Sequence, residues 1–354
     1  MARSVRYGVI GTGMMGLEHL LNLRLLEDVQ VTAIADPHET SRTNGRNTAP
    51  PGVEVYEDHR DLLAKAPVDA VVVATPNHTH ASVLEDVFRA DKHVLVEKPL
   101  CTTLEDCRRI AALAERHPGV VWVGMEYRYM PPVARLLQEL RGGAVGRLRM
   151  VAIREHRFPF LPKVGHWNRF ARNTGGTLVE KCCHFFDLMS LMVQARPTRV
   201  YASGAQDVNH RQERYDGERP DVLDNAYCVV DFENGARALL DLCMFAEGSR
   251  HEQEIAVVGD AGKLECFVPE STVVIGRRMP KRVESVHVPV EERLLRAGFH
   301  HGATYFEHVA FLRAIRGGPV EVGPAEGLLA VALGQAGERS VREGRPVALA
   351  ELGL

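Results

Sequence analysis

The sequence lacks several features that would assign it to whole classes of protein. No apolar run approaches the roughly 20 residues of a membrane-spanning helix, so we expect no membrane partner. The formal net charge is only -3, which gives no reason to expect nucleic acid as a partner. The chain has no internal repeats and no low-complexity segment. Its 45% hydrophobic and 25% charged residues are typical of a soluble globular protein.

The cysteines do not form the pattern of a disulfide framework or of a zinc site. There are seven, an odd number, and Cys182 and Cys183 are adjacent. No Cys-x-x-Cys pair occurs anywhere in the chain, and we expect no metal. The chain opens with MARSVRYGVIGTG, which enters a strand almost at once and leaves no room for a signal peptide. We therefore expect free thiols and a cytoplasmic protein.

The length of 354 residues is enough for two domains. Residues 1–124 alternate short apolar strands with helical patterns, which predicts a parallel sheet with helices on both faces. The predicted strands are Arg6–Ile10, Val29–Ala35, Val53–Tyr56, Asp69–Ala74, His93–Val96 and Val120–Gly124. The clearest helical patterns between them are Met14–Glu27, His78–Arg89 and Leu104–Arg116.

Residues 125–354 follow a different pattern, and we place a second domain there. Several β-like runs, at 147–157 and 199–290, surround one helical segment near 177–195. Asn234-Gly235 predicts a hairpin, and GDAGK at 259–263 predicts another tight turn. Two helical stretches and a short strand, at 304–316, 324–343 and Pro346–Ala350, end the chain. This pattern predicts an α+β domain built on an antiparallel sheet, and the last helices could pack back on the first domain.

A dinucleotide-binding signature follows the first predicted strand. Gly11, Gly13 and Gly16 form G-x-G-x-x-G at the start of a predicted helix, where glycines allow a tight turn and close approach to a pyrophosphate. Asp36 ends the second strand, 20 residues past Gly16, where a carboxylate can bind an adenosine ribose and would repel a 2′-phosphate. We therefore predict NAD as cofactor, while Arg42 keeps NADP open. Within and beside the glycine-rich turn, Met14 and Met15 are also expected to line the cofactor.

Two further motifs follow the fourth and fifth predicted strands. They are ATPNHTH at 74–80 and EKPL at 97–100. The carboxyl ends of strands line the ligand crevice of a doubly wound sheet, so Lys98 is expected to project toward the nicotinamide. Burial and the positive nicotinamide ring would favour its neutral form. From these motifs we expect cofactor contacts from Thr75, Pro76, Asn77, His80, Glu97 and Lys98.

The segment GGTLVEKCCHFFDLM at 175–189 carries candidate acid–base residues. In a helix that starts near Thr177, Glu180, His184 and Asp187 share one stripe. Histidine suits proton removal near neutral pH, and a carboxylate one turn away can hold its ring. Thr177 to Glu180 also fits a capping box, in which Glu180 would reach back to the helix start. Cys182 falls on the predicted core face.

The combined motifs resemble the glucose–fructose oxidoreductase, inositol dehydrogenase and rhizopine catabolism family (Gfo/Idh/MocA). The matching segments are VIGTGMMG (9–16), YEDHRDLL (56–63), ATPNHTH (74–80), VEKPL (96–100), the 175–187 pattern and the last helix and tail at 325–347. The resemblance implies an N-terminal Rossmann domain with a doubly wound parallel sheet. It also implies a C-terminal α+β domain with a large, open, mainly antiparallel sheet that commonly joins subunits, here as a homodimer or homotetramer. Pro99 is expected to follow a cis peptide bond.

The resemblance also implies roles for individual residues. The positions matching Lys98, Glu180 and His184 carry the family's catalytic groups, although aspartate is more usual at position 180. Places where the family contacts substrate match EYRYMPP at 126–132 and EHRFPF at 155–160, from which we select Arg128 and His156. Trp167 is a further candidate. The implied activity is hydride transfer between NAD and a secondary hydroxyl of a sugar, inositol or related polyol.

Other interpretations of the same residues stay open. Some relatives use bound NAD transiently during glycoside cleavage or epimerisation. A non-enzymatic dinucleotide sensor could be built on the same scaffold. Residues 147–172 hold seven Arg or Lys and only one acid, Glu155, which fits either an anionic substrate such as a sugar acid or a solvated face.

Overall fold

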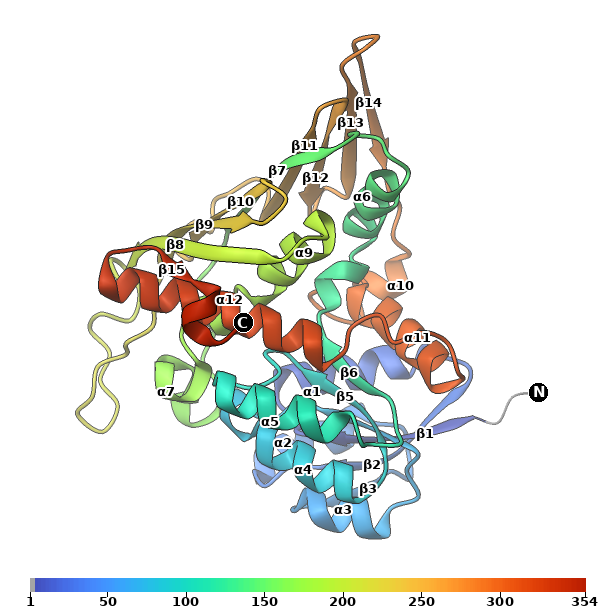
Figure 1. The fold of residues 1–354 in the computed structure, drawn as a ribbon. Helices are drawn as coiled ribbons and strands as arrows, with labels where there is room; N and C mark the ends of the chain where they lie inside the picture. The colour runs from blue at the N-terminus through green and yellow to red at the C-terminus, as the bar shows by residue number, and fades with distance from the viewer. Residues whose placement is uncertain (1–3) are drawn as a thin grey trace. The chain divides into compact units, whose positions relative to one another are not determined.

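The computed structural model describes residues 4–354, which divide into two compact units (Figure 1). The first unit contains residues 4–129 and Glu291–Val331. The second contains Met130–Val290 and Ala332–Leu354. We call them the Rossmann unit and the open-sheet unit. The chain thus returns to the Rossmann unit before the last strand of the open sheet is formed, and the last boundary falls within the long helix α12, Pro324–Glu343.

The Rossmann unit is built on six parallel strands, as predicted, and their order is β3-β2-β1-β4-β5-β6. The strands are β1 (Val5–Ile10), β2 (Val29–Ala35), β3 (Glu54–Tyr56), β4 (Ala70–Val73), β5 (His93–Glu97) and β6 (Val121–Gly124). Its helices include α1 (Met14–Leu23), α2 (Glu39–Thr48), α3 (His59–Lys65), α4 (His80–Arg89), α5 (Leu104–Ala114), α10 (Glu292–Leu295) and α11 (Ala303–Ile315). All residues of β4 and β6 are buried, because helices cover both faces of the sheet. The carboxyl ends of the strands therefore share one edge, where the sequence motifs lie.

The open-sheet unit contains nine strands in the order β14-β13-β12-β11-β7-β10-β9-β8-β15. They are β7 (Leu148–His156), β8 (Pro197–Ala205), β9 (Asn225–Phe232), β10 (Arg237–Cys243), β11 (Gln253–Gly259), β12 (Gly262–Val268), β13 (Thr272–Arg277), β14 (Arg282–His287) and β15 (Val347–Ala348). Neighbouring strands are antiparallel, except that β7 and β10 run parallel. The sheet is therefore mixed and mainly antiparallel, as predicted.

Both predicted turns join neighbouring strands. Asn234-Gly235 connects β9 to β10, and Gly235 has φ +80°, the left-handed conformation that this turn requires of a residue. The turn at 259–263 connects β11 to β12. Strand residues alternate between buried and exposed, and helices α6 (Pro131–Arg141) and α9 (Cys183–Val193) pack against the sheet. One face of this sheet thus belongs to the core, while the other is exposed.

The predicted single helix near 177–195 is wrong in its continuity. The segment forms α8 (Thr177–Glu180) and α9 (Cys183–Val193), with a turn at Lys181 and Cys182. Just before them lies α7 (Ala171–Thr174), which ends in Gly175 at φ +82°. Gly176, at φ +97°, begins α8 directly after it. Two successive glycines with positive φ let the chain turn sharply between the two helices. Helix α8 is therefore separate from α7 and is not its continuation.

Candidate active site

The three motif glycines meet three different steric demands. Gly11 has φ +89°, and a Cβ there would lie 2.6 Å from the carbonyl oxygen of Ala74. A Cβ on Gly16 would overlap the carbonyl oxygen of Gly11, so this glycine lets α1 pack on the turn. A Cβ on Gly13 would meet no atom within 4 Å. Gly13 also precedes the first residue of α1, whose unpaired N–H groups favour an anion. This turn fits a pyrophosphate.

Asp36 holds the glycine-rich turn and the end of β2 together. Its Oδ2 accepts the backbone N–H of Thr12 at 2.8 Å, and its Oδ1 accepts the N–H of His38 at 2.9 Å. The residue is 8% exposed, so the carboxylate is fixed with little freedom. A carboxylate has about four acceptor sites, and these two bonds leave capacity for ribose hydroxyls. The position matches the predicted cofactor role.

Arg42, the residue that kept NADP open, is held by neighbouring groups. Its Nη1 donates to the carbonyl oxygens of Asp36 and Pro37, at 2.9 and 2.7 Å. Its Nη2 donates to Glu57 Oε1 at 2.7 Å. The guanidinium group would have to leave these acceptors, including a carboxylate, to bind a 2′-phosphate.

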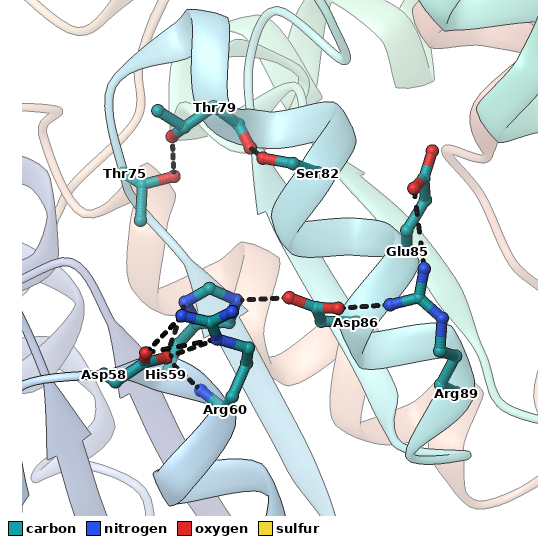
Figure 2. A network of polar contacts seen from close by, with 9 residues as sticks. All are labelled: Asp58, His59, Arg60, Thr75, Thr79, Ser82, Glu85, Asp86 and Arg89. Atoms are coloured by element: carbon teal, nitrogen blue, oxygen red, sulfur yellow. Dashed lines mark hydrogen bonds and ion pairs between the residues drawn. The ribbon is translucent and has the colours of Figure 1, made fainter.

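The segment after β4 is tied to the segment after β5. His80 is fully buried, with Nδ1 2.8 Å from the Pro99 carbonyl oxygen and Nε2 3.0 Å from the Thr75 carbonyl oxygen. Burial lowers the pKa of His80. Thr79 Oγ1 lies 2.8 Å from Thr75 Oγ1, and Ser82 caps the same turn by donating to the Thr79 carbonyl (Figure 2). The His80 ring thus joins the loop after β4 to the loop after β5, because both of its nitrogens lie against backbone carbonyls of these loops.

Asn77 and Pro76 also shape this loop. Pro76 precedes a short 3-10 helix, Asn77–Thr79. The side-chain amide nitrogen of Asn77 is buried and has no hydrogen-bond partner among residues 4–354. A buried donor without a partner is costly, and a cofactor amide or hydroxyl oxygen would satisfy it. This is a second feature that fits a bound dinucleotide.

A separate polar network lies on the neighbouring outer helices α3 and α4 (Figure 2). His59 Nε2 is 2.9 Å from Asp86 Oδ2, and its Nδ1 is 3.7 Å from Asp58 Oδ1. Asp58 also caps α3 by accepting the N–H of Arg60. The His59 side chain is 23% exposed, so water shares in these contacts. The network stabilises the packing of α3 on α4, and its histidine, unlike His19, is partly exposed.

Lys98 follows β5 and precedes a cis peptide bond to Pro99, as expected from the resemblance. The neighbouring Glu97 is 4% exposed and points into the unit, where Oε1 lies 2.8 Å from His19 Nε2. Its Oε2 accepts the backbone N–H of Lys98 at 3.2 Å. Glu97, predicted to contact the cofactor, therefore has its carboxylate turned toward α1. Met14 and Met15 form the first turn of that helix.

Buried acids that the sequence analysis did not select, together with the half-buried His300, surround Glu97. Glu126 is 1% exposed, and burial followed by the charge of Glu97 raises its pKa to about 7. His300 Nε2 is 3.6 Å from Glu126, and His300 Nδ1 is 2.9 Å from Glu18. Burial alone would raise the pKa of Glu18, but the hydrogen bond and charge of His300 contribute to lowering it to about 2. Burial also raises the pKa of Glu307 well above its ordinary value. The local signal was the two adjacent ionisable residues Glu18 and His19 in a helix that is otherwise mainly apolar.

In the open-sheet unit, His184 and Glu180 are both buried, at 2% and 5% exposure. The start of α8 is capped from another helix, because Glu338 of α12 accepts the N–H of Leu178 at 2.9 Å. Gly334 makes this possible, since a Cβ there would be 2.6 Å from the Leu178 carbonyl oxygen. Burial raises the pKa of Glu338 to about 7. The N-cap of α8 is Gly176, so the predicted capping box with Thr177 as its cap residue does not form.

Lys181, in the turn between α8 and α9, forms a buried ion pair. Its Nζ lies 2.7 Å from Glu155 Oε1, and both side chains are at most 7% exposed. Glu155 also lies 3.3 Å from Arg157 Nη1. Cys183 Sγ donates to the Glu180 carbonyl at 3.6 Å. Cys182 is fully buried, as expected, and burial raises the pKa of its thiol well above its usual range. The ion pair fixes the segment of His184 to strand β7.

The structure does not bring His156 to the face that holds His184. Val151, Ile153 and Glu155 of β7 are buried, so the alternating His156 belongs to the exposed face. There its Nε2 is 3.0 Å from Asp241 Oδ1 of β10. The inward neighbour Glu155 is the residue that reaches the His184 segment. Strand alternation in the sequence could have revealed this.

The other two substrate candidates have defined neighbours. Arg128 of the Rossmann unit is 8% exposed, and its Nη1 donates to the Glu321 carbonyl at 2.7 Å. Trp167 of the open-sheet unit lies under the ammonium of Lys163, which is 5.1 Å from its ring centre. Arg128 thus helps to anchor the segment before α12, while Trp167 remains half-buried.

The basic stretch 147–172 meets acids from elsewhere in the open-sheet unit. Arg154 pairs with Glu254, Arg157 with Glu155 and Glu252, Arg169 with Glu213, and Arg172 with Glu218. Burial alone would raise the pKa of Glu213, but hydrogen bonds from His210, Tyr215 and Arg169 lower it to about 2. Much of the positive charge in the stretch is therefore balanced within the fold.

Residues 4–354 contain no group of three or more His, Cys, Asp or Glu side chains arranged to hold a metal ion. None of the helices in the same range combines the length and apolar character that a membrane crossing needs.

A six-stranded doubly wound sheet, a glycine-rich turn open at Gly13 and an acid at the end of β2 define a dinucleotide-binding Rossmann domain. The chain belongs to the Gfo/Idh/MocA oxidoreductase family. The family's NAD-binding Rossmann fold matches residues 5–125, and its C-terminal alpha/beta domain matches residues 138–349.

Known relatives match over most of the chain. A myo-inositol 2-dehydrogenase from Thermotoga maritima is 28% identical, over 98% of this chain and 99% of that protein. The rhizopine catabolism protein MocA from Rhizobium meliloti is 31% identical, over 67% of this chain and 70% of that protein. The crystal structure of a probable dehydrogenase from Thermotoga maritima superposes with a TM-score of 0.80 at 27% identity, covering 98% and 99% of the two chains.

Proposed function

We propose that this protein is an NAD-dependent dehydrogenase that oxidises a secondary hydroxyl of an inositol or a closely related cyclic polyol. The observation that carries the proposal is the full-length similarity to a myo-inositol 2-dehydrogenase, together with Lys98 and His184 at positions that match the family's catalytic groups and the acid Glu180 where aspartate is more usual. The buried settings of His184 and Glu180 support it, because proton transfer and water exclusion favour such groups.

The Rossmann unit would hold the cofactor. Gly11, Gly13 and the first turn of α1 would bind the pyrophosphate, Asp36 the adenosine ribose, and Asn77 a polar group through its buried amide. When bound, NAD supplies the acceptor for the hydride. The bonds of Arg42 to two carbonyls and Glu57 support NAD over NADP.

His184 would be the general base. Oxidation of a secondary alcohol requires loss of the hydroxyl proton as hydride leaves the same carbon, and an imidazole can accept that proton near neutral pH. Glu180 would orient the ring. Glu180 has one methylene more than the more usual aspartate, so its carboxylate lies farther from the backbone. The buried Lys181–Glu155 pair and the Glu338 cap support this role, because they fix the segment that carries both residues.

Lys98 would donate a hydrogen bond to the reacting oxygen. Its place directly after β5, with His80 holding the Pro99 carbonyl and Glu97 accepting the Lys98 N–H, supports a fixed direction for the chain at this residue. Arg128 and Trp167 remain the candidates for substrate contacts. His156 is left out, since it belongs to the exposed face of the sheet.

The pairing of the basic stretch 147–172 favours a neutral substrate over a sugar acid. A carboxylate would have to draw a guanidinium group away from Glu213, Glu218, Glu252 or Glu254. A neutral polyol needs only hydrogen bonds, which hydroxyl groups can exchange with polar side chains at small cost.

We also propose that the exposed face of the open sheet joins two copies of the chain. Tyr201 and Leu239 both pair with Val229, and Leu239 pairs with Ala152, so these four residues form a continuous apolar row. Tyr227 beside them is 62% exposed, which is unusual for a large apolar side chain. Light scattering of the purified protein should give a dimer or tetramer, and a monomer would contradict this part of the proposal.

The direct test is NADH absorbance with purified protein, NAD or NADP, and a panel of inositols, neutral sugars and sugar acids. We expect signal with NAD on cyclic polyols and little signal on sugar acids. Activity only on acids would overturn the neutral-substrate assignment. NADH binding with silence across the panel would contradict the dehydrogenase. It would instead favour a redox-neutral glycoside-cleaving or epimerising enzyme, or a sensor.

A further inference from the structure

Two loops of the open-sheet unit meet at the carboxylate of Glu213. From the loop before α7, Arg169 has its Nε 2.9 Å from Glu213 Oε2. From the loop between β8 and β9, His210 Nδ1 lies 2.8 Å from Oε1, and the Tyr215 hydroxyl donates to Oε2 at 2.8 Å. The ring of His166 stacks on Tyr215, with 4.3 Å between the ring centres. We call these five residues the Glu213 cluster.

Backbone and side-chain contacts fasten the two loops together and to α8. The side chain of Asp221 accepts the N–H of Ala171 at 2.7 Å. Thr177 Oγ1, at the start of α8, donates to the Leu223 carbonyl at 2.7 Å. Figure 1 shows the loop between β8 and β9 beside α7. The cluster is therefore joined, through short and well-fixed connections, to the helix that carries Glu180.

Three nitrogens of the Glu213 cluster are buried and have no hydrogen-bond partner among residues 4–354. They are Arg169 Nη1, His210 Nε2 and His166 Nδ1. The side chains of Arg169 and His210 are only 3% and 8% exposed. On both of these residues Glu213 binds another nitrogen, so the nitrogen without a partner faces a different direction. Buried polar groups are costly without a partner, and a ligand with hydrogen-bonding groups would satisfy all three.

The charges of the cluster favour a neutral ligand. Burial alone would raise the pKa of Glu213, but hydrogen bonds from His210, Tyr215 and Arg169 lower it to about 2. Glu213 is therefore ionised at neutral pH and offsets the charge of Arg169. A hydroxyl group can accept from Arg169 Nη1, and it can either donate to an imidazole nitrogen or accept from one. A molecule with several hydroxyl groups and no charge matches this set.

We propose that Arg169, His166 and His210 form a subsite for those hydroxyl groups of the polyol that are not oxidised. This inference rests on the proposed function, in which Glu180 and His184 act at the reacting hydroxyl. The subsite selects which cyclic polyols bind, while the chemical step is left to the catalytic groups. Contacts of this kind are the same in the bound substrate and in the transition state, so their loss raises KM and leaves kcat nearly unchanged.

The test is steady-state kinetics of two conservative variants on the inositol that the wild type oxidises. His210→Asn keeps a polar atom near the place of Nδ1 for Glu213 and suits the φ of +59° at this position, but it lacks Nε2. It should raise KM by at least about 5-fold, the usual effect of one lost hydrogen bond, with kcat within about 2-fold. Arg169→Lys keeps the charge but lacks the second nitrogen of the fork, and it should raise KM by at least about 10-fold.

Monodeoxy forms of the same inositol separate direct contact from a structural role. The rise in KM for His210→Asn should vanish on the form that lacks the hydroxyl bound by His210, since neither protein can then make that bond. Equal rises on every form would overturn the proposal.

The matched control is His251→Asn in the same unit. His251 also contacts two carboxylates, of Glu254 and Glu270, and packs against the ring of Phe267, but both of its nitrogens have partners. His251→Asn should therefore leave KM unchanged.

Binding is measured separately from turnover, so that failure of the subsite and failure of the proposed function can be distinguished. The probes for saturation-transfer NMR with the protein–NADH complex are myo-, scyllo- and chiro-inositol and any other cyclic polyol that is oxidised. Binding that is weakened in His210→Asn, without NADH formation by the wild type, would support the subsite and contradict the proposed function. Turnover with unchanged KM in His210→Asn and Arg169→Lys, at retained melting temperature, would contradict the subsite alone. Absence of binding by all of these polyols would overturn the subsite.

Discussion

The two units bury charge in different ways. The Rossmann unit surrounds its buried glutamates with histidines, as in the contacts of Glu97 with His19 and of Glu18 with His300. The open-sheet unit pairs opposite full charges, Lys181 with Glu155. An imidazole can donate or accept and can change its charge near neutral pH, whereas in the 2.7 Å pair the lysine can only donate and the ionised carboxylate can only accept.

The difference fits what each unit is proposed to do. Lys98 is proposed to take part in a reaction that moves protons, and its environment consists of groups whose hydrogen bonds can be rearranged. The segment with His184 must keep a base in one orientation, and a closed ion pair together with the Glu338 cap holds its backbone. Breaking the ion pair of the open-sheet unit should therefore lower stability, whereas removing Lys98 from the Rossmann unit should lower catalysis.

The largest effect is expected from breaking the ion pair. Lys181→Met should lower the free energy of unfolding by about 3 kcal/mol, near the lower end for a buried pair because Arg157 stays 3.3 Å from Glu155. Urea denaturation measures this loss. The exposed pair Arg199–Asp231 is the control, and Arg199→Ala should cost at most about 1 kcal/mol. Equal small losses in both variants would mean that burial adds nothing to the Lys181 pair.

Catalysis should fail when the lysine of the Rossmann unit is removed. Lys98→Ala should lower turnover on an active polyol by at least about 10²-fold, the scale of a lost proton-transfer or oxyanion contact, while NADH binding stays near wild type. Steady-state NADH absorbance and NADH fluorescence titration measure the two quantities. Lys65→Ala, on the exposed face of α3, is the matched control and should leave both unchanged.

The Rossmann strands could be predicted from the sequence with small boundary errors, because most are short apolar runs, and β4 and β6 are buried throughout. Helix α2, ETSRTNGRNT, was not predicted, since it is polar and rich in Thr, Asn and Gly. Helix α3 has only seven residues, too few for a clear period. The turn at Lys181 was also missed, because the tertiary contacts of Lys181 and Glu338 override a continuous helical pattern.

The candidate site was accessible from the sequence only where a local motif exists. The glycine turn, Asp36 and Lys98 are marked by their distance from a strand end. Glu97 and His19 meet through the tertiary fold, and no local spacing in a single sequence indicates such contacts. His156 was selected by likeness of position, although strand alternation already indicated Glu155 as the inward residue.

A smaller effect should come from the buried cap of α8. Burial raises the pKa of Glu338 from 4.5 to about 7, so the folded state favours the protonated carboxyl. This contribution to stability is present below the unfolded pKa and is lost as pH rises through about 7. Glu338→Gln stays neutral and can still accept the Leu178 N–H. It should therefore gain stability relative to wild type from pH 5 to pH 8, by roughly 1–3 kcal/mol.

Thermal unfolding at pH 5, 6, 7 and 8 would test this prediction. The exposed Glu343 of the same helix is the control, since its pKa is lowered by Arg339, and Glu343→Gln should show no such gain. A constant difference between Glu338→Gln and wild type across the pH range would show that Glu338 does not titrate there.

The smallest contrast concerns cofactor choice within the Rossmann unit. Asp36→Ala should lower the preference for NAD over NADP by at least about 10-fold, because one charged hydrogen-bond acceptor is worth roughly 1.5–3 kcal/mol. Arg42→Ala should change the preference by less than about 3-fold, since Arg42 is held by carbonyls and Glu57. Ratios of kcat/KM for the two cofactors measure both. A larger effect from Arg42 would assign it to the 2′-phosphate after all.

The central claim is that hydride passes from a secondary carbinol carbon of a polyol to NAD. Mass spectrometry of the cofactor after turnover of C-deuterated myo-inositol, and of each other deuterated polyol that the panel finds active, tests it most directly. The account predicts NADH that carries one deuterium, formed together with the ketone. Reduced cofactor without deuterium, or bound NADH with no polyol oxidised, would contradict it.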